Sequence, residues 1–226
     1  MPIKVTPLTE PDIPGAITCI QQAFEHDPYN NWVFDKKNFS FERNSVSLGI
    51  RCRWGMSYAL FSVAKDTDDP KGKVLGVACW LAPRNPAAPQ SWSDWVGDWW
   101  LWAMQVRMNI WYGHGGLNVR RYWIWKAAQA EAQNELWTDP KGYYFCNIVT
   151  VLPEAQGRGV GKLLFKRVTD VADREGRKCY LESSREEPNM GIYEKMGFEL
   201  KKEMVCDDEG EKVKLFCTIR EPHSPT

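Results

Sequence analysis

A glycine-rich junction between a strand and a helix constrains this sequence more than any other feature. Before the junction, residues 143–151 are rich in aromatic and β-branched side chains, which is typical of a strand. After it, apolar side chains recur with the spacing of one helix face, at Val160, Leu163, Leu164, Val168 and Val171. Glycines let the backbone turn sharply and direct N–H groups outward from the helix N-terminus. The junction is therefore predicted to bind a phosphate or a pyrophosphate.

The spacing of the glycines distinguishes among the known phosphate-binding loops. A Walker A loop has four residues between its glycines and then Lys and Ser/Thr, whereas three residues separate Gly157 from Gly161 and Leu163 follows Lys162. A dinucleotide-binding loop reads G-x-G-x-x-G, whereas the glycines here alternate. The pattern Q-x-x-G-x-G fits Gln156, Gly159 and Gly161. A turn that binds no ligand is the remaining alternative.

At these residues the chain resembles the GNAT acyltransferase superfamily, in which a Q/R-x-x-G-x-G/A loop binds the pyrophosphate of acyl-coenzyme A (acyl-CoA). A second motif strengthens the resemblance, because Asn189 is followed by Tyr193 and then by Gly197 and Phe198 with the GNAT spacing. Pro188 suits the first turn of a helix and Gly197 its C-terminal cap. One predicted helix and one predicted strand separate the two motifs, as in that superfamily. A core aromatic role is the alternative for Tyr193.

The string Leu181-Glu182-Ser183-Ser184, taken with the second motif, is particularly similar to small-molecule N-acetyltransferases of the puromycin-modifying kind. This resemblance covers residues 140–206 well and the first 80 residues only in outline. It implies that the acceptor is the amine of a small hydrophobic or aromatic molecule.

The superfamily resemblance implies that acetyl-CoA is the co-substrate. Backbone groups of Val149 and Val151 are expected to pair with the pantetheine arm as a further strand would, and an N–H of this strand to bind the thioester oxygen. The N–H groups of residues 158–162 are expected to hold the pyrophosphate. The residues expected at the acyl-CoA site are Ile148, Val149, Val151, Gln156, Gly157, Arg158, Gly159, Val160, Gly161, Lys162, Ser184, Asn189 and Tyr193.

The resemblance also implies that an amine attacks the thioester and that Tyr193 donates to the leaving thiolate. Glu182 and Glu25 are the other expected catalytic residues, as candidates for the base that accepts the proton of the amine. Many GNAT enzymes carry a glutamate on the fourth strand, but residues 146–150 contain no carboxylate. Asp27 and His26 are further candidates. We favour a water relay in an aromatic pocket that disfavours the ammonium form.

Bulk properties exclude several other classes of function. The 226 residues are 43% apolar, which is enough for one domain over residues 1–226. The formal net charge is zero and no long basic run exists, so nucleic acid is not an expected partner. The seven scattered cysteines and three lone histidines have no metal-site spacing, and reduced thiols suit the cytoplasm. No signal peptide or membrane span is apparent.

The order of predicted elements indicates an α/β (α+β) fold of the GNAT kind. Strands are expected at residues 3–6, 58–65, 73–82, 143–151, 177–183, 198–206 and 212–219, with helices at 12–25, 41–56, 91–111, 119–137, 160–171 and 188–197. They predict a mixed, twisted, mostly antiparallel sheet with helices on both faces. Residues 141–206 would form the acyl-CoA-binding core, and residues 83–140 a helical insertion before the fourth strand.

The insertion carries nine of the twelve tryptophans, at positions 92, 95, 99, 100, 102, 111, 123, 125 and 137. Two amphipathic helices that pack these rings on the sheet would account for several of them. Because the number exceeds what two such helices normally bury, we expect other rings to line a substrate pocket. A membrane-surface role is the third alternative, although the basic residues of the insertion are offset by acidic ones.

The function predicted from the sequence is an N-acetyltransferase that moves an acetyl group from acetyl-CoA to a primary amine of a small molecule, by direct attack in a ternary complex. A protein N-terminal or lysine acetyltransferase is the first alternative, and it requires an open peptide groove. A non-catalytic acyl-CoA sensor is the second, favoured by the carboxylate missing from the fourth strand and opposed by Tyr193. We expect a monomer or a homodimer, and no metal.

Overall fold

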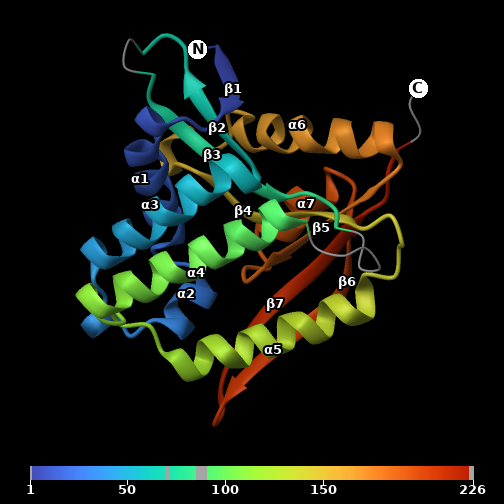
Figure 1. Ribbon diagram of the computed structural model, residues 1–226. Helices are drawn as coiled ribbons and strands as arrows, with labels where there is room; N and C mark the ends of the chain where they lie inside the picture. Colours follow the sequence, from blue (N-terminus) through green and yellow to red (C-terminus); the bar gives the residue numbers. More distant parts are fainter. Residues whose placement is uncertain (1, 70–71, 85–90, 224–226) are drawn as a thin grey trace.

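The computed structural model describes residues 2–69, 72–84 and 91–223 (Figure 1). Its strands are β1 (Ile3–Pro7), β2 (Leu60–Asp66), β3 (Val74–Leu81), β4 (Tyr143–Val151), β5 (Lys178–Ser183), β6 (Phe198–Asp208) and β7 (Glu211–Arg220). Its α-helices are α1 (Ile13–Phe24), α2 (Pro28–Val33), α3 (Phe41–Tyr58), α4 (Trp92–Tyr112), α5 (Val119–Leu136), α6 (Val160–Glu175) and α7 (Asn189–Glu194). Short 3-10 helices are η1 (Glu10–Asp12), η2 (Lys36–Asn38) and η3 (Pro153–Ala155).

The described strands form one seven-stranded sheet in the order β1-β2-β3-β4-β5-β7-β6. The pair β4 and β5 is parallel, and the other neighbouring pairs are antiparallel. The crossover between the two parallel strands contains α6, as a parallel connection requires. The predicted fold class is confirmed.

The sheet opens between β4 and β5. Their parallel pairing ends at Cys146 and Leu181, beyond which β4 continues against β3 alone and β5 against β7. The register between β3 and β4 shifts at this point, because Trp80 lies opposite Cys146 while Cys79 lies opposite Ile148, which leaves Asn147 as an extra residue. The last residues of β4 therefore have no strand on the side of β5.

Helices cover both faces of the sheet and enclose two apolar cores (Figure 1). In the first core, α1, α3 and α6 pack against β2, β3 and β4. In the second, α2 and α5 cover β5, β6 and β7. Gly76 on β3 lets α6 lie close, since a Cβ there would be 2.8 Å from the Thr150 carbonyl oxygen and 2.9 Å from Val160.

The two insertion helices pack differently, which corrects one expectation. Their positions agree with the predicted helices, but α4 packs mainly on α3 rather than on the sheet. Buried Arg43 of α3 donates to Asn109 of α4 at 2.8 Å. Of the nine insertion tryptophans, Trp125 and Trp137 pack on the second core, whereas the rings of α4 are largely exposed. Packing on the sheet thus explains fewer rings than expected.

None of the helices in the described part of the chain combines the length and the apolar character that crossing a lipid bilayer requires.

The close approach of α6 to Gly76 generates a stability prediction. Gly76→Ala should lower the free energy of unfolding by about 1–3 kcal/mol, because the nearest obstacle is a backbone carbonyl that cannot rotate away. Urea unfolding measures this change. Gly191→Ala is the matched control, since a Cβ at Gly191 meets no atom within 4 Å. Equal stability of both variants would contradict the packing described.

Candidate active site

The glycine junction forms the N-terminus of α6 in the conformation that the sequence predicts. Gly157 and Gly159 have φ angles of +74° and +78°, in the left-handed region that favours glycine. Gly159 is the N-cap residue, and no side chain caps the helix there. The N–H groups of the first turn are therefore open to an anion, which the helix dipole also favours. Arg158 adds a positive charge, 3.8 Å from the Asp66 carboxylate.

Tyr193 projects from α7 toward the opened end of the sheet. Its ring packs 5.7 Å from Phe165 and 6.2 Å from Phe198, measured between centroids. Gly197, with φ +86°, ends this segment and leads into β6, as predicted. Burial raises the pKa of the Tyr193 phenol above its ordinary value, so the hydroxyl stays protonated. Within the described residues the hydroxyl has no hydrogen-bond partner.

A cavity of about 1220 Å³ lies between the opened sheet and the helices α1 to α5. It brings together many of the residues that the sequence singles out, namely Glu25, Ile148, Val149, Glu182, Ser184, Asn189 and Tyr193. Val151 and residues 156–162 do not line it and instead lie at the far end of β4 and the start of α6. The predicted residues therefore form two groups that β4 connects.

The Glu182 carboxylate lines the cavity and accepts several hydrogen bonds. It accepts hydrogen bonds from Gln129 at 2.8 Å, Gln133 at 3.3 Å and Tyr180 at 2.9 Å. Burial raises the pKa of the Glu182 carboxyl, and these hydrogen bonds offset part of the rise. Lys126 donates to Gln129 at 2.8 Å and extends the network.

The sequence prediction missed the two glutamines that bond to Glu182, of which Gln129 lines the cavity. Gln129 and Gln133 lie one turn apart on α5, so they share a helix face. The sequence could indicate from this spacing that the two amides share a helix face. Only the fold shows that this face lies against Glu182.

The other candidate bases lie around the loop between α1 and α2. Both carboxylate oxygens of Asp27 accept hydrogen bonds within the fold. One caps α2 by accepting from the Asn30 N–H at 3.0 Å, and the other accepts from the Ser184 hydroxyl. Glu25 and His26 are exposed at the cavity wall. In the described part of the chain, the Glu25 side chain has no hydrogen bond or ion pair.

Asn189 and Ser184 hold the loop between β5 and α7. The Asn189 amide donates to the Ser183 hydroxyl at 3.0 Å. The Ser184 hydroxyl is directed to Asp27 and joins this loop to the start of α2. Both residues line the same cavity as Tyr193.

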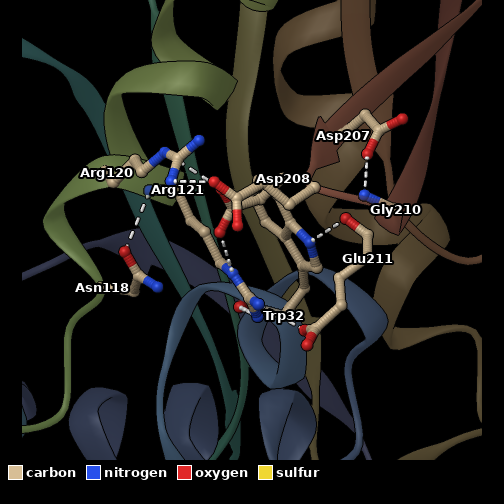
Figure 2. A network of polar contacts seen from close by, with 9 residues as sticks. Trp32, Asn118, Arg120, Arg121, Asp207, Asp208, Gly210 and Glu211 are labelled. Carbon is tan, nitrogen blue, oxygen red and sulfur yellow. Dashed lines mark hydrogen bonds and ion pairs between the residues drawn. The ribbon is translucent and has the colours of Figure 1, made fainter.

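A network of charged contacts lies at the N-terminal end of α5 (Figure 2). Arg121 donates to Asp208 at 2.9 Å and to the Trp32 carbonyl at 2.8 Å, and it also pairs with Glu211. Arg120 lies 3.1 Å from Asp208 as well. The N-terminal end of α5 is therefore attached both to α2 and to the hairpin of β6 and β7.

The described residues include no cluster of three or more His, Cys, Asp or Glu side chains that could hold a metal ion. All seven cysteines are buried, and none forms a disulfide. Besides Glu182 and Tyr193, the titratable side chains Glu25, His26 and Asp27 line the cavity.

The glutamine pair generates a prediction about the pKa of Glu182. The double variant Gln129→Leu/Gln133→Leu should raise this pKa further, because both amides stabilise the charged carboxylate. NMR titration of carboxyl-labelled glutamate measures it. Asn134→Leu, on an exposed position of α5, should leave the titration unchanged. A parent-like titration in the double variant would show that the amides do not act on Glu182.

Residues 120–200 match the family model of the acetyltransferase (GNAT) domain. Over 164 residues the chain is 26% identical to an uncharacterized N-acetyltransferase of Schizosaccharomyces pombe, which is 68% of this chain and 59% of that relative. The matched part thus spans well under two thirds of the relative's length.

Two solved structures share the fold. A histone acetyltransferase HPA2 and related acetyltransferase from Corynebacterium glutamicum superposes with a TM-score of 0.61 at 19% identity, over 100% of this chain and 99% of that chain. The NatC complex bound to Gag peptide and CoA gives a TM-score of 0.53 at 15% identity, over 99% and 100%. Identities this low show the fold alone.

Proposed function

We propose that this chain, whose residues 120–200 match the acetyltransferase (GNAT) domain, moves an acetyl group from acetyl-CoA to a primary amine of a small molecule. The observation that supports the proposal most is the opened edge of β4. This edge connects the glycine junction at α6 with the cavity that contains Tyr193. We take residues 1–226 as one domain, with residues 83–140 as an insertion and 141–206 as the acyl-CoA core.

In this proposal the donor binds along β4. The pantetheine arm pairs with backbone groups of Val149 and Val151, whose side of β4 has no neighbouring strand. The pyrophosphate sits on the N–H groups of residues 158–162, assisted by the charges of Arg158 and Lys162. The thioester then reaches the cavity near Ile148, where a strand N–H stabilises the developing negative charge on the thioester oxygen.

Tyr193 assists departure of the thiolate by a hydrogen bond. A phenol of pKa near 10 is a weaker acid than a thiol of pKa near 8.5, so complete proton transfer is uphill by roughly 2 kcal/mol. Burial raises the pKa of Tyr193 further and makes that transfer still less favourable. A hydrogen bond that strengthens as charge develops on sulfur needs no such transfer.

A base is required because an alkylammonium of pKa about 10.4 is only about 0.04% neutral at pH 7. Glu182 and Glu25 both line the cavity, and the raised pKa of Glu182 makes it more basic than an ordinary carboxylate. We assign the proton to a water relay that ends at Glu182. An unchanged acidic limb of kcat/KM in Glu182→Gln would remove Glu182 from this role, and the same test applies to Glu25.

The insertion favours a small acceptor over a protein chain. Helices α4 and α5 both contribute walls to the cavity, and α5 is attached at its N-terminal end by Arg120 and Arg121. An extended peptide would need an open groove at this place. The cavity has instead an aromatic lining that suits a hydrophobic amine, in which the Trp125 ring contacts the rings of both Tyr29 and Tyr122.

Release of the CoA thiol tests the proposal. We expect the purified protein to hydrolyse acetyl-CoA slowly and to release thiol faster when a panel of primary arylalkyl and alkyl amines is added. Peptides with free N-termini or lysines should give no acceleration. Tight binding of acetyl-CoA without acceleration by any amine would favour a sensor, and acceleration by peptides alone would favour a protein acetyltransferase.

Tyr193→Phe tests the role of the phenol. We expect kcat to fall about 10²–10³-fold, the usual loss when one hydrogen-bond donor to a developing charge is removed, because the ring packing survives and the hydroxyl is lost. The dissociation constant of acetyl-CoA, measured by calorimetry, should change little. Turnover equal to that of the parent would exclude Tyr193 from the chemical step.

A further inference from the structure

Four tryptophans on α4 form a continuous exposed row, which we call the tryptophan row: Trp92, Trp95, Trp99 and Trp102. Their spacing places them on one face of the helix. Successive ring centroids lie 4.8, 5.8 and 5.2 Å apart. The four residues are 75%, 44%, 51% and 59% exposed. Contiguous exposed apolar side chains of this kind mark sites that bind a ligand, another protein or a membrane.

The tryptophan row ends at the cavity. Trp102 lines the cavity and is largely exposed, so it lies at the opening. Trp123 of α5 also lines the cavity and is 64% exposed. The cavity therefore opens between α4 and α5, with one tryptophan from each helix at its mouth.

Aromatic rings continue from the mouth into the cavity. Tyr122 is next to Trp123, with ring centroids 5.5 Å apart, and Tyr122 lies 5.8 Å from Trp125. Trp125 in turn lies 5.0 Å from Tyr29. The cavity of about 1220 Å³ exceeds the roughly 300–1,000 Å³ that ordinary small ligands occupy. The space and the row together suit a ligand longer than the cavity.

We propose that the acceptor is an elongated apolar amine whose nitrogen reaches the opened sheet and whose tail leaves between α4 and α5 along the tryptophan row. This inference rests on the proposed acetyltransferase function and specifies its substrate class. A tail on the row is favoured over a second copy of the chain because Trp102 makes the row continuous with the cavity. Asp94 and Asp98 on α4 disfavour an anionic membrane surface.

The tail contact predicts that catalytic efficiency depends on chain length. Each buried methylene contributes about 0.8 kcal/mol, which corresponds to about fourfold in kcat/KM. We therefore expect kcat/KM to rise from ethylamine to dodecylamine. In Trp95→Ala/Trp99→Ala, whose rings lie outside the cavity lining, the ratio of kcat/KM for dodecylamine to that for ethylamine should fall about tenfold or more.

Trp111→Ala is the matched control. Trp111 is a tryptophan of the same helix with 76% exposure, and its position lies on the side of α4 opposite to Trp102. This variant should retain the length dependence of the parent. A ratio that is flat in the parent, or that is equal in the double variant and the parent, would overturn the inference while leaving the acetyltransferase function intact.

Binding without turnover separates the two proposals. With CoA present, N-acetyldodecylamine should bind by calorimetry at least about tenfold more weakly to Trp95→Ala/Trp99→Ala than to the parent. Equal binding would overturn the inference even if no amine is acetylated. The inference is also overturned if the double variant changes only the sedimentation of the protein or its binding to zwitterionic vesicles, which would assign the row to a second copy or to a lipid surface.

Discussion

The loss of pairing between β4 and β5 after Cys146 and Leu181 is the constraint on which the rest of the structure depends. Backbone N–H and C=O groups need partners when they leave water, and a strand that loses its neighbour exposes a row of them. Asn147 is the extra residue that bends β4 at this point. The exposed edge runs from the cavity to the glycine junction. One linear ligand can therefore hydrogen-bond to the unpaired backbone groups of β4 and to the N–H groups at the start of α6.

Helix α5 both lines the cavity and packs on the second core. Residues of α5 fill the second core, while Gln129 and Gln133 on its inner face donate to Glu182. Arg121 attaches the start of the helix to the hairpin of β6 and β7 (Figure 2). Helix α5 therefore combines packing in the second core, ion pairs at its N-terminal end and hydrogen bonds to Glu182.

The features predicted best from the sequence are those that depend on a few neighbouring residues, such as glycines at the ends of helices. Gly159 and Gly197 adopt the left-handed conformations expected at a helix start and a helix end, and the resemblance placed Tyr193 between them in the correct element. Helix α2 was missed although Asp27 and Pro28 form a standard helix start. The packing of α4 on α3 was not predictable, because exposed tryptophans carry the same pattern as buried ones.

Residue-resolved amide hydrogen exchange during titration with acetyl-CoA tests the central claim most directly. We expect slower exchange at the amides of residues 147–151 and 158–162, because the pantetheine arm and the pyrophosphate would bond to them. Amides of β6 and β7, which already pair with each other, should not change. Unchanged exchange in both β4 and the start of α6 at saturating acetyl-CoA would contradict the account.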